Sequence, residues 1–314
     1  MAFDALLGND RLKENLISSL SRNRVSHFYL ISGPNGSGKH TLAKLLASAI
    51  FCGETDRPCG RCAACRKMLS GNHPDFITVE DPEHKTTAVK IVRQMRDDMF
   101  VRPNEADYKI YLFPQELGIE GQNALLKILE EPPAYGVFIL LTDNPEKLLP
   151  TVRSRCTELA LHGLPEATLE QALRLEFPEA SMEDLRGAMV RSGGFLGQAR
   201  NLLAGEGMTP QTEGFARGFG ARDALTLAQV LVPMEKWKRD QLIEQLEQWL
   251  SLLENALASR AGLPAISVLE RELSARRSSA ELMHGIRCIQ KALEYARGNV
   301  SPAAICGWLR WELK

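Results

Sequence analysis

The chain has 314 residues, with 38 Lys and Arg residues against 39 Asp and Glu residues, and a hydrophobic fraction of 44%. At roughly 100–200 residues per domain, this length predicts two or three domains, and the composition excludes disordered, collagen-like and coiled-coil proteins. A net charge of −1 disfavours a dedicated nucleic-acid binder, which usually carries a basic surface. Neither a long apolar run nor a signal-peptide pattern occurs, so we expect a cytoplasmic protein without a membrane partner.

The first half of the chain alternates two kinds of pattern. Short apolar runs predict buried strands, and apolar residues repeated at helical spacing predict helices. The strands are expected at 28–31, 109–113 and 137–142, and the helices at 42–49, 89–99 and 122–131. Such alternation is typical of an α/β fold with a doubly wound parallel sheet.

After residue 161 only helical patterns remain. Three short ones lie between 165 and 203, broken by Pro178 and by Gly193-Gly194, and indicate a small helical domain. Longer apolar stripes at 242–257 and 282–296 predict a helical bundle from residue 209 onward. The second stripe is expected to end at Gly298-Asn299, and a last helix to begin at Ser301-Pro302.

A phosphate-binding loop follows the first predicted strand. Gly33, Gly36, Gly38 and Lys39 lie between that strand and a helix, with the spacing that lets backbone N–H groups wrap a phosphate. A glycine-rich turn without a ligand is the competing interpretation. The next residue should carry a hydroxyl for Mg²⁺, but it is His40, and Thr41 points elsewhere on the helix.

The second half of the metal site is also missing. The strand at 109–113 should end in an aspartate that holds the metal, but Pro114-Gln115 follows it, and the first acid, Glu116, is expected in a turn. The loop could therefore bind ATP or ADP, but we do not expect hydrolysis, nor catalysis by the chain alone.

Seven cysteines are present, and four of them fall within fourteen residues: Cys52, Cys59, Cys62 and Cys65. Cytoplasmic cysteines stay reduced, so this spacing indicates a metal site rather than disulfides. Four thiolates complete a tetrahedral shell, as in structural Zn²⁺ sites, although thiolates also hold iron–sulfur clusters. The remaining cysteines are expected to be isolated and buried: Cys156, Cys288 and Cys306.

An arginine pair follows the predicted strand at 137–142. Arg153 and Arg155 lie in Thr-Val-Arg-Ser-Arg-Cys, shortly after Asp143-Asn144-Pro145. In an isolated domain this segment would be a solvated basic turn. In an oligomeric nucleotide-dependent machine, an arginine here could reach the γ-phosphate bound by a neighbouring subunit.

Together these residues resemble the delta-prime subunits of bacterial DNA polymerase III clamp loaders, a family within the AAA+ superfamily. The resemblance covers nearly the whole chain. Besides the loop and the cysteines, it rests on Ser26-His27-Phe28, Asn72-His73-Pro74-Asp75, the block from Asn123 to Pro133, and Ser154-Arg155-Cys156. It implies an AAA+ P-loop domain at 1–161 with a zinc insertion at 52–65, a three-helix lid domain at 162–208, and an all-α collar at 209–314 that joins the subunits.

The resemblance also implies roles. Arg155 matches an arginine finger that acts in trans. Residues Thr142 to Asn144 lie where sensor 1 sits, and Asn144 is assigned to the nucleotide site. Gly197 stands where the active gamma and tau relatives carry a sensor 2 arginine, although Arg200 follows closely. The implied partners are gamma or tau and delta subunits in a hetero-oligomer, with the sliding clamp and primer–template DNA reached through the assembled complex.

Three functions follow as hypotheses. The leading one is a non-hydrolysing delta-prime-type subunit that helps to load the sliding clamp. The alternative is an active gamma/tau-like ATPase in which Glu116 and Thr41 bind the metal. The third is a zinc-dependent DNA-binding module that uses Lys90, Arg93 and Arg96, residues that could equally form a solvated helix face.

Overall fold

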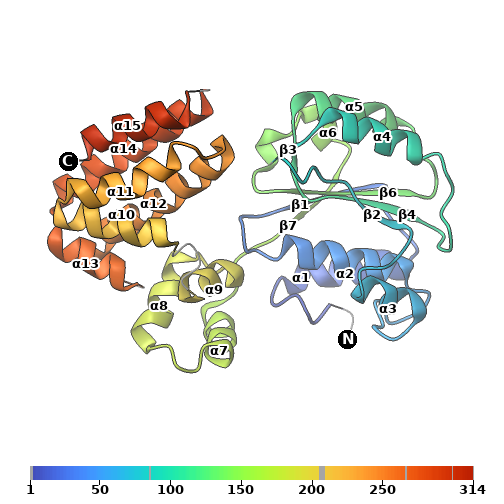
Figure 1. Cartoon of the computed structure of the whole chain (residues 1–314). Helices are drawn as coiled ribbons and strands as arrows, with labels where there is room; N and C mark the ends of the chain where they lie inside the picture. The colour runs from blue at the N-terminus through green and yellow to red at the C-terminus, as the bar shows by residue number, and fades with distance from the viewer. Residues whose placement is uncertain (1–2, 85, 205–208, 266, 299, 314) are drawn as a thin grey trace. The chain divides into compact units, whose positions relative to one another are not determined.

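The computed structural model describes residues 3–84, 86–204, 209–265, 267–298 and 300–313 (Figure 1). The chain divides into two compact units, one formed by Met1–Leu169 with Gly194–Gln198 and the other by Glu170–Gly193 with Ala199–Lys314. The three-domain division stays a prediction, and its second boundary, at residue 208, lies outside the described residues. In the described segments, no helix is both long and apolar enough to cross a membrane.

A five-stranded parallel sheet organises the described part of the first unit, in the order β2-β4-β6-β1-β7. A separate parallel pair joins β3 to β5. The strands are β1 (Phe28–Ser32), β2 (Phe76–Thr78), β3 (Thr86–Thr87), β4 (Lys109–Phe113), β5 (Glu116–Leu117), β6 (Gly136–Thr142) and β7 (Thr157–Ala160).

Helices cover both faces of this sheet. Figure 1 shows α1, α2 and α3 on one face and α4, α5 and α6 on the other. The helices of this unit are α1 (Asp10–Ser21), α2 (Lys39–Phe51), α3 (Ala63–Leu69), α4 (Val89–Asp98), α5 (Ile119–Glu130), the 3₁₀ helix η1 (Pro145–Lys147) and α6 (Pro150–Arg153).

Alternate residues of the central strands pack into two separate hydrophobic cores, one on each face of the sheet. In β1, Tyr29 and Ile31 pack with α1 and α2, whereas Phe28 and Leu30 pack with α4 and α5. Both faces of the central strands are therefore buried, which explains why those strands read as continuous apolar runs. The edge strands β2 and β7 are only partly buried, and their sequences gave no such signal.

In the described residues of the second unit, all the regular secondary structure is helical. Helices α7 (Glu166–Glu176) and α9 (Leu196–Ala204) begin in the first unit and end in the second. The other helices are α8 (Met182–Arg191), α10 (Pro210–Ala221), α11 (Ala224–Met234), α12 (Arg239–Arg260), α13 (Val268–Arg276), α14 (Ser279–Arg297) and α15 (Pro302–Glu312).

The two predicted apolar stripes form the core of this unit. They lie on α12 and α14, and Trp249 of α12 is fully buried with its ring stacked on Phe215 at 4.2 Å between centroids. Helix α15 begins as predicted, with Ser301 as N-cap and Pro302 in the first turn. Gly298 is the C-cap of α14, whereas Asn299 lies outside the described residues.

These observations confirm the predicted fold class: an α/β domain with a parallel sheet and a four-cysteine insertion, followed by an all-helical region. Two details differ from the predictions. Helix α5 begins at Ile119 rather than at residue 122, and Glu116 lies in strand β5 rather than in a turn.

Candidate functional site

The phosphate loop closes on its own lysine. It connects the end of β1 to the start of α2, and the buried Lys39 ammonium donates to the Gly33 carbonyl (2.6 Å) and the Pro34 carbonyl (3.0 Å). The same ammonium forms an ion pair with the Asp143 carboxylate, at 2.6 Å. The charge that would meet a phosphate is therefore already neutralised by an acid of this chain.

The apex of the loop is covered by the first turn of α9. The Gly197 N–H donates to the Gly36 carbonyl at 3.0 Å, and a Cβ on Gly36 would lie 2.5 Å from the Gln198 nitrogen. Gly36 also has φ +74°, so glycine is required there both by backbone conformation and by the close approach. A nucleotide that used the full loop would have to share it with this helix.

The hydroxyl position of the loop gives no oxygen ligand. His40 is exposed in the first turn of α2. Desolvation lowers the pKa of its imidazole, and the positive charges of Lys39 and Lys44 lower it further, so a neutral ring stands where Mg²⁺ would need oxygen. Thr41 is half-buried one residue further along the helix, and Gly38, which is the N-cap of α2, has φ +96°.

Pro114 and Gln115 follow β4, where a metal-binding acid was expected, and all the hydrogen-bonding atoms of the Gln115 amide have partners within the chain. The Gln115 side chain accepts hydrogen bonds from the Asp81 N–H (2.8 Å) and the Thr87 hydroxyl (3.2 Å). It also donates to the carbonyls of Asp81 (2.9 Å) and His84 (2.8 Å). Gln115 thus connects Asp81, His84 and Thr87 to the end of β4.

The nearby acid Glu116 is also engaged. Its carboxylate accepts from the Lys147 ammonium at 2.6 Å. A metal role for Glu116 would require this ion pair to break.

The two polar residues after β6, Asp143 and Asn144, make different contacts. The Asn144 side chain accepts from the Glu146 N–H at 2.9 Å and so caps η1, while its neighbour Asp143 contacts Lys39. Sequence reasoning placed Asp143 in the sensor 1 segment but missed its ion pair with Lys39. The available signal was its place directly after a strand, because the carboxyl ends of parallel strands meet at one edge of the sheet.

Arg155 is exposed just after α6. Its guanidinium donates to the Thr151 carbonyl at 2.9 Å and lies 3.4 Å from the Glu130 carboxylate, which belongs to the Asn123–Pro133 block. Arg153 instead pairs with Glu146 at 2.5 Å and Glu158 at 3.5 Å.

The Arg155 backbone and the phosphate loop lie at opposite ends of the neighbouring strands β1 and β7. Strands β1 and β7 run parallel, with Tyr29 paired to Thr157 and Ser32 to Ala160. The loop follows the carboxyl end of β1, whereas Arg155 precedes the amino end of β7. Because the four residues of β7 alone span about 10 Å, the Arg155 backbone is separated from its own chain's phosphate loop by at least the length of this strand.

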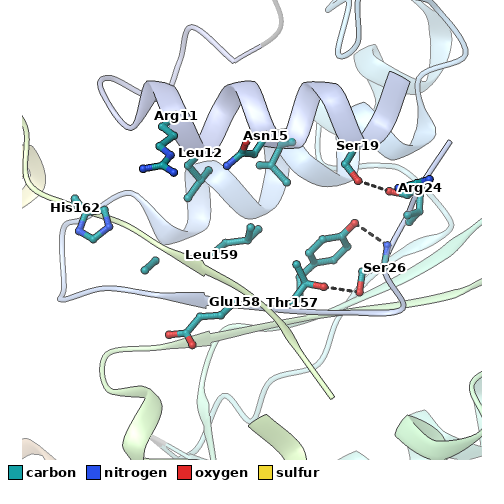
Figure 2. A pocket seen from close by; sticks show the side chains of 14 residues that line it. Arg11, Leu12, Asn15, Ser19, Arg24, Ser26, Thr157, Glu158, Leu159 and His162 are labelled. Atoms are coloured by element: carbon teal, nitrogen blue, oxygen red, sulfur yellow. Dashed lines mark hydrogen bonds between the residues drawn. The ribbon is translucent and has the colours of Figure 1, made fainter. Parts of the chain in front are cut away.

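The Ser26-His27-Phe28 motif contacts the first residue of β7. The Thr157 hydroxyl donates to the Ser26 hydroxyl at 2.9 Å, as Figure 2 shows. These side chains border a cavity of about 600 Å³ between α1 and β7. Anchoring Thr157 in this way also positions Arg155, two residues earlier.

The four clustered cysteines come together as predicted. Their sulfur atoms all lie within 4.8 Å of one another, with Cys52 and Cys65 buried and Cys59 and Cys62 half-buried. The Cys62 N–H donates to the Cys59 sulfur at 3.3 Å, and the Cys65 N–H donates to the Cys62 sulfur at 3.4 Å. A tetrahedral metal ion fits this arrangement of donors.

The thiols of this cluster have different acidities. Hydrogen bonds from the backbone of Arg61 and Cys62 lower the pKa of Cys59 to about 6. Burial raises the pKa of Cys65 to about 12 and also raises that of Cys52. The cluster therefore combines one thiolate-forming position with buried thiols that need a cation to ionise.

The Asn-His-Pro-Asp motif has a structural role that the sequence did not show. The fully buried Asp75 carboxylate accepts from the N–H groups of Asn104 (2.5 Å), Glu105 (3.0 Å) and Ala106 (3.0 Å). Burial opposes its ionisation, but these hydrogen bonds outweigh that effect and hold the pKa of Asp75 below its usual value.

The other predicted positions are placed as follows. Arg200 pairs with Glu176 in a bidentate contact, through Nε and Nη2 of its guanidinium. Cys306 is buried as expected, and Cys156 is half-buried. Cys288 is buried but not isolated, because it lies beside His284 and Glu312.

Comparison with known proteins identifies the family of the chain. A family model described as "DNA polymerase III, delta subunit" matches residues 8–165, half of the chain. The chain belongs to this family of DNA polymerase III subunits. The matched range ends directly before α7, so the match lies within the α/β unit of the chain.

Several curated relatives are named gamma or tau. The chain is 33% identical over 229 residues to the tau subunit of Bacillus subtilis, covering 72% of this chain and 37% of that one. It is 37% identical over 175 residues to the tau/gamma subunit of Haemophilus influenzae (54% and 25% covered), and 29% identical over 315 residues to the Salmonella typhimurium tau subunit (96% and 48%). The chain thus spans less than half the length of these relatives.

One solved structure aligns with most of the chain, with a low TM-score. It is a gamma-subunit-related protein of DNA polymerase III from Thermotoga maritima, with a TM-score of 0.45, 18% identity, and 95% of this chain and 100% of that chain covered.

Proposed function

We propose that the chain is a non-hydrolysing, delta-prime-type subunit of a DNA polymerase III clamp loader. In this role Arg155 acts on the nucleotide of a neighbouring gamma- or tau-type subunit. Two features together support this proposal most directly. Arg155 is exposed before the amino end of β7, and the phosphate loop's own lysine, Lys39, is ion-paired with Asp143.

The state of the chain's own nucleotide site supports this division of roles. Lys39 is paired with Asp143, His40 replaces the hydroxyl that holds Mg²⁺, and Pro114-Gln115 follows β4 where an acid was expected. ATP hydrolysis needs the metal to neutralise developing charge on the phosphates. Nucleotide bound at this loop would therefore persist without turnover.

The helical region supports assembly with other subunits. We assign 209–314 as a collar that contacts gamma or tau and delta subunits, and 162–208 as a lid on the AAA+ domain at 1–161. The sliding clamp and primer–template DNA are then reached by the complex rather than by this chain alone. A near-zero net charge agrees with protein subunits as first partners.

We also propose that Cys52, Cys59, Cys62 and Cys65 hold one structural Zn²⁺. Four sulfur donors leave no open coordination position, so the ion would stabilise the insertion between α2 and α3 rather than activate water. Binding would release protons from the buried thiols and couple to folding of this segment.

A reconstituted clamp loader tests the Arg155 role. Arg155→Ala should reduce DNA-stimulated ATPase and clamp loading while the subunits still assemble. Arg153→Ala is the matched control, because Arg153 lies two residues earlier on the same segment and pairs with Glu146 and Glu158. Unchanged loading by the Arg155→Ala complex would refute the proposal.

An active gamma/tau-like ATPase is the second candidate, favoured by the names of the curated relatives. It requires Glu116 to leave Lys147 and Thr41 to reach the metal. Turnover by the isolated chain decides between the two: Mg²⁺-dependent hydrolysis that Lys39→Ala abolishes would establish the ATPase.

The DNA-binding hypothesis has one supporting observation. Arg93, Arg96 and Lys127 line a shared cavity of about 440 Å³ between α4 and α5. A salt-dependent affinity of the isolated chain for duplex DNA would support it, because phosphate contacts release counterions.

A further inference from the structure

A second group of metal-binding side chains lies in the helical unit, far along the chain from the four cysteines. His284 and Cys288 are one turn apart on α14, and Glu312 is the last residue of α15. Their ligand atoms all lie within 4.8 Å of one another. The i, i+4 spacing places the histidine and the cysteine on one face of α14, toward the end of α15.

The distances within this group suit a tetrahedral ion. The Cys288 sulfur lies 3.6 Å from His284 Nε2. Zinc bonds of about 2.3 Å to sulfur and 2.0 Å to nitrogen, meeting at a tetrahedral angle, separate the two donors by about 3.5 Å. The two side chains therefore need little movement to share one ion.

The donor types select the ion. One sulfur, one nitrogen and one carboxylate oxygen form the mixed set that zinc accepts, whereas Ca²⁺ and Mg²⁺ prefer oxygen alone. On binding, the Cys288 thiol gives its proton to solvent. The thiolate and the Glu312 carboxylate then balance the two positive charges of the ion.

The present hydrogen bond of His284 is compatible with this site. Its Nε2 lies 3.0 Å from the Glu312 backbone carbonyl, at the end of α15. The ring is exposed, so it can turn to offer a nitrogen to the ion, while Cys288 is buried and fixed by the core of the unit.

We propose that His284, Cys288 and Glu312 form a zinc site, with a water molecule as fourth ligand, that fastens the end of α15 to α14. The two helices follow one another in the chain through a short connection at 298–301. The ion would close the opposite end of this helix pair. This proposal does not depend on the clamp-loader assignment.

Zinc titration of the full chain by calorimetry, with ZnCl₂ as the probe, tests the site. The wild-type protein should bind one more zinc than His284→Ala or Cys288→Ser, or bind it at least about 100-fold more tightly, since even outer-shell changes cost about 10–100-fold. His284→Ala removes an exposed ring and leaves the core intact.

Cys306→Ser is the matched control, because Cys306 is a buried cysteine of the same unit outside the group. It should bind zinc as the wild type does. Comparing variants with the wild type keeps the result independent of the four-cysteine site. Equal zinc binding by the wild type and His284→Ala would overturn the proposal.

Discussion

The carboxylate of Asp143 lies 2.6 Å from the Lys39 ammonium, where the carboxyl ends of two neighbouring strands meet. Ser32 of β1 is paired with Thr142 of β6, so the residue after each strand enters the same small region. The Gly33 N–H donates to the Thr142 carbonyl at 3.2 Å and joins the phosphate loop to this region. The ammonium of the loop lysine, which would normally contact a phosphate, here forms an ion pair with a carboxylate of the same chain.

Releasing Lys39 should strengthen nucleotide binding. We expect Asp143→Asn to raise the affinity for a fluorescent ADP analogue about fivefold, corresponding to about 1 kcal/mol for a partly exposed ion pair. Mg²⁺-dependent turnover should remain absent, because His40 and Gln115 are unchanged. Glu146→Gln, in the same turn, is the control and should bind as the wild type does. An unchanged or lower affinity in Asp143→Asn would contradict the account.

The four-cysteine cluster should retain one zinc per chain after dialysis, measured by elemental analysis. Cys59→Ser should lose this zinc and make segment 53–64 more sensitive to protease, because metal binding and folding are coupled. Cys156→Ser removes a thiol outside the cluster and should keep the zinc. Full zinc content and unchanged protease resistance in Cys59→Ser would end the structural-site proposal.

Asp75 should stabilise the segment that precedes β4. Asp75→Ala leaves three backbone N–H groups without their acceptor, and we expect a loss of about 3 kcal/mol in the free energy of unfolding. Hydrogen exchange at Asn104, Glu105 and Ala106 should accelerate in this variant. Asp107→Ala, an exposed neighbour, should change stability by no more than about 0.5 kcal/mol. Equal exchange rates in the two variants would show that the carboxylate has no such role.

The central elements of the fold could be predicted from sequence because their signals are local. Strand β4 was predicted with its observed bounds, since it is buried on both faces and reads as an apolar run. The phosphate loop and the four cysteines carry fixed spacings. Edge strand β7 was missed because only one of its four residues is buried.

The missed parts of the site depend on contacts between distant segments. Asp143 reaches Lys39 across 104 residues of chain, and Gly197 covers Gly36 from a helix much later in the sequence. Glu116 looked like a turn residue because β5 is two residues long and pairs with β3. Cys288 looked isolated because its neighbours His284 and Glu312 meet only when α14 and α15 pack.

The measurement that tests the account most directly is clamp loading by a complex reconstituted with Arg155→Ala. Loading and DNA-stimulated ATPase should fall at least about tenfold, since arginine fingers contribute strongly to phosphate transfer, while assembly and the Arg153→Ala complex stay normal. Loading at the wild-type rate by an intact Arg155→Ala complex would contradict the account.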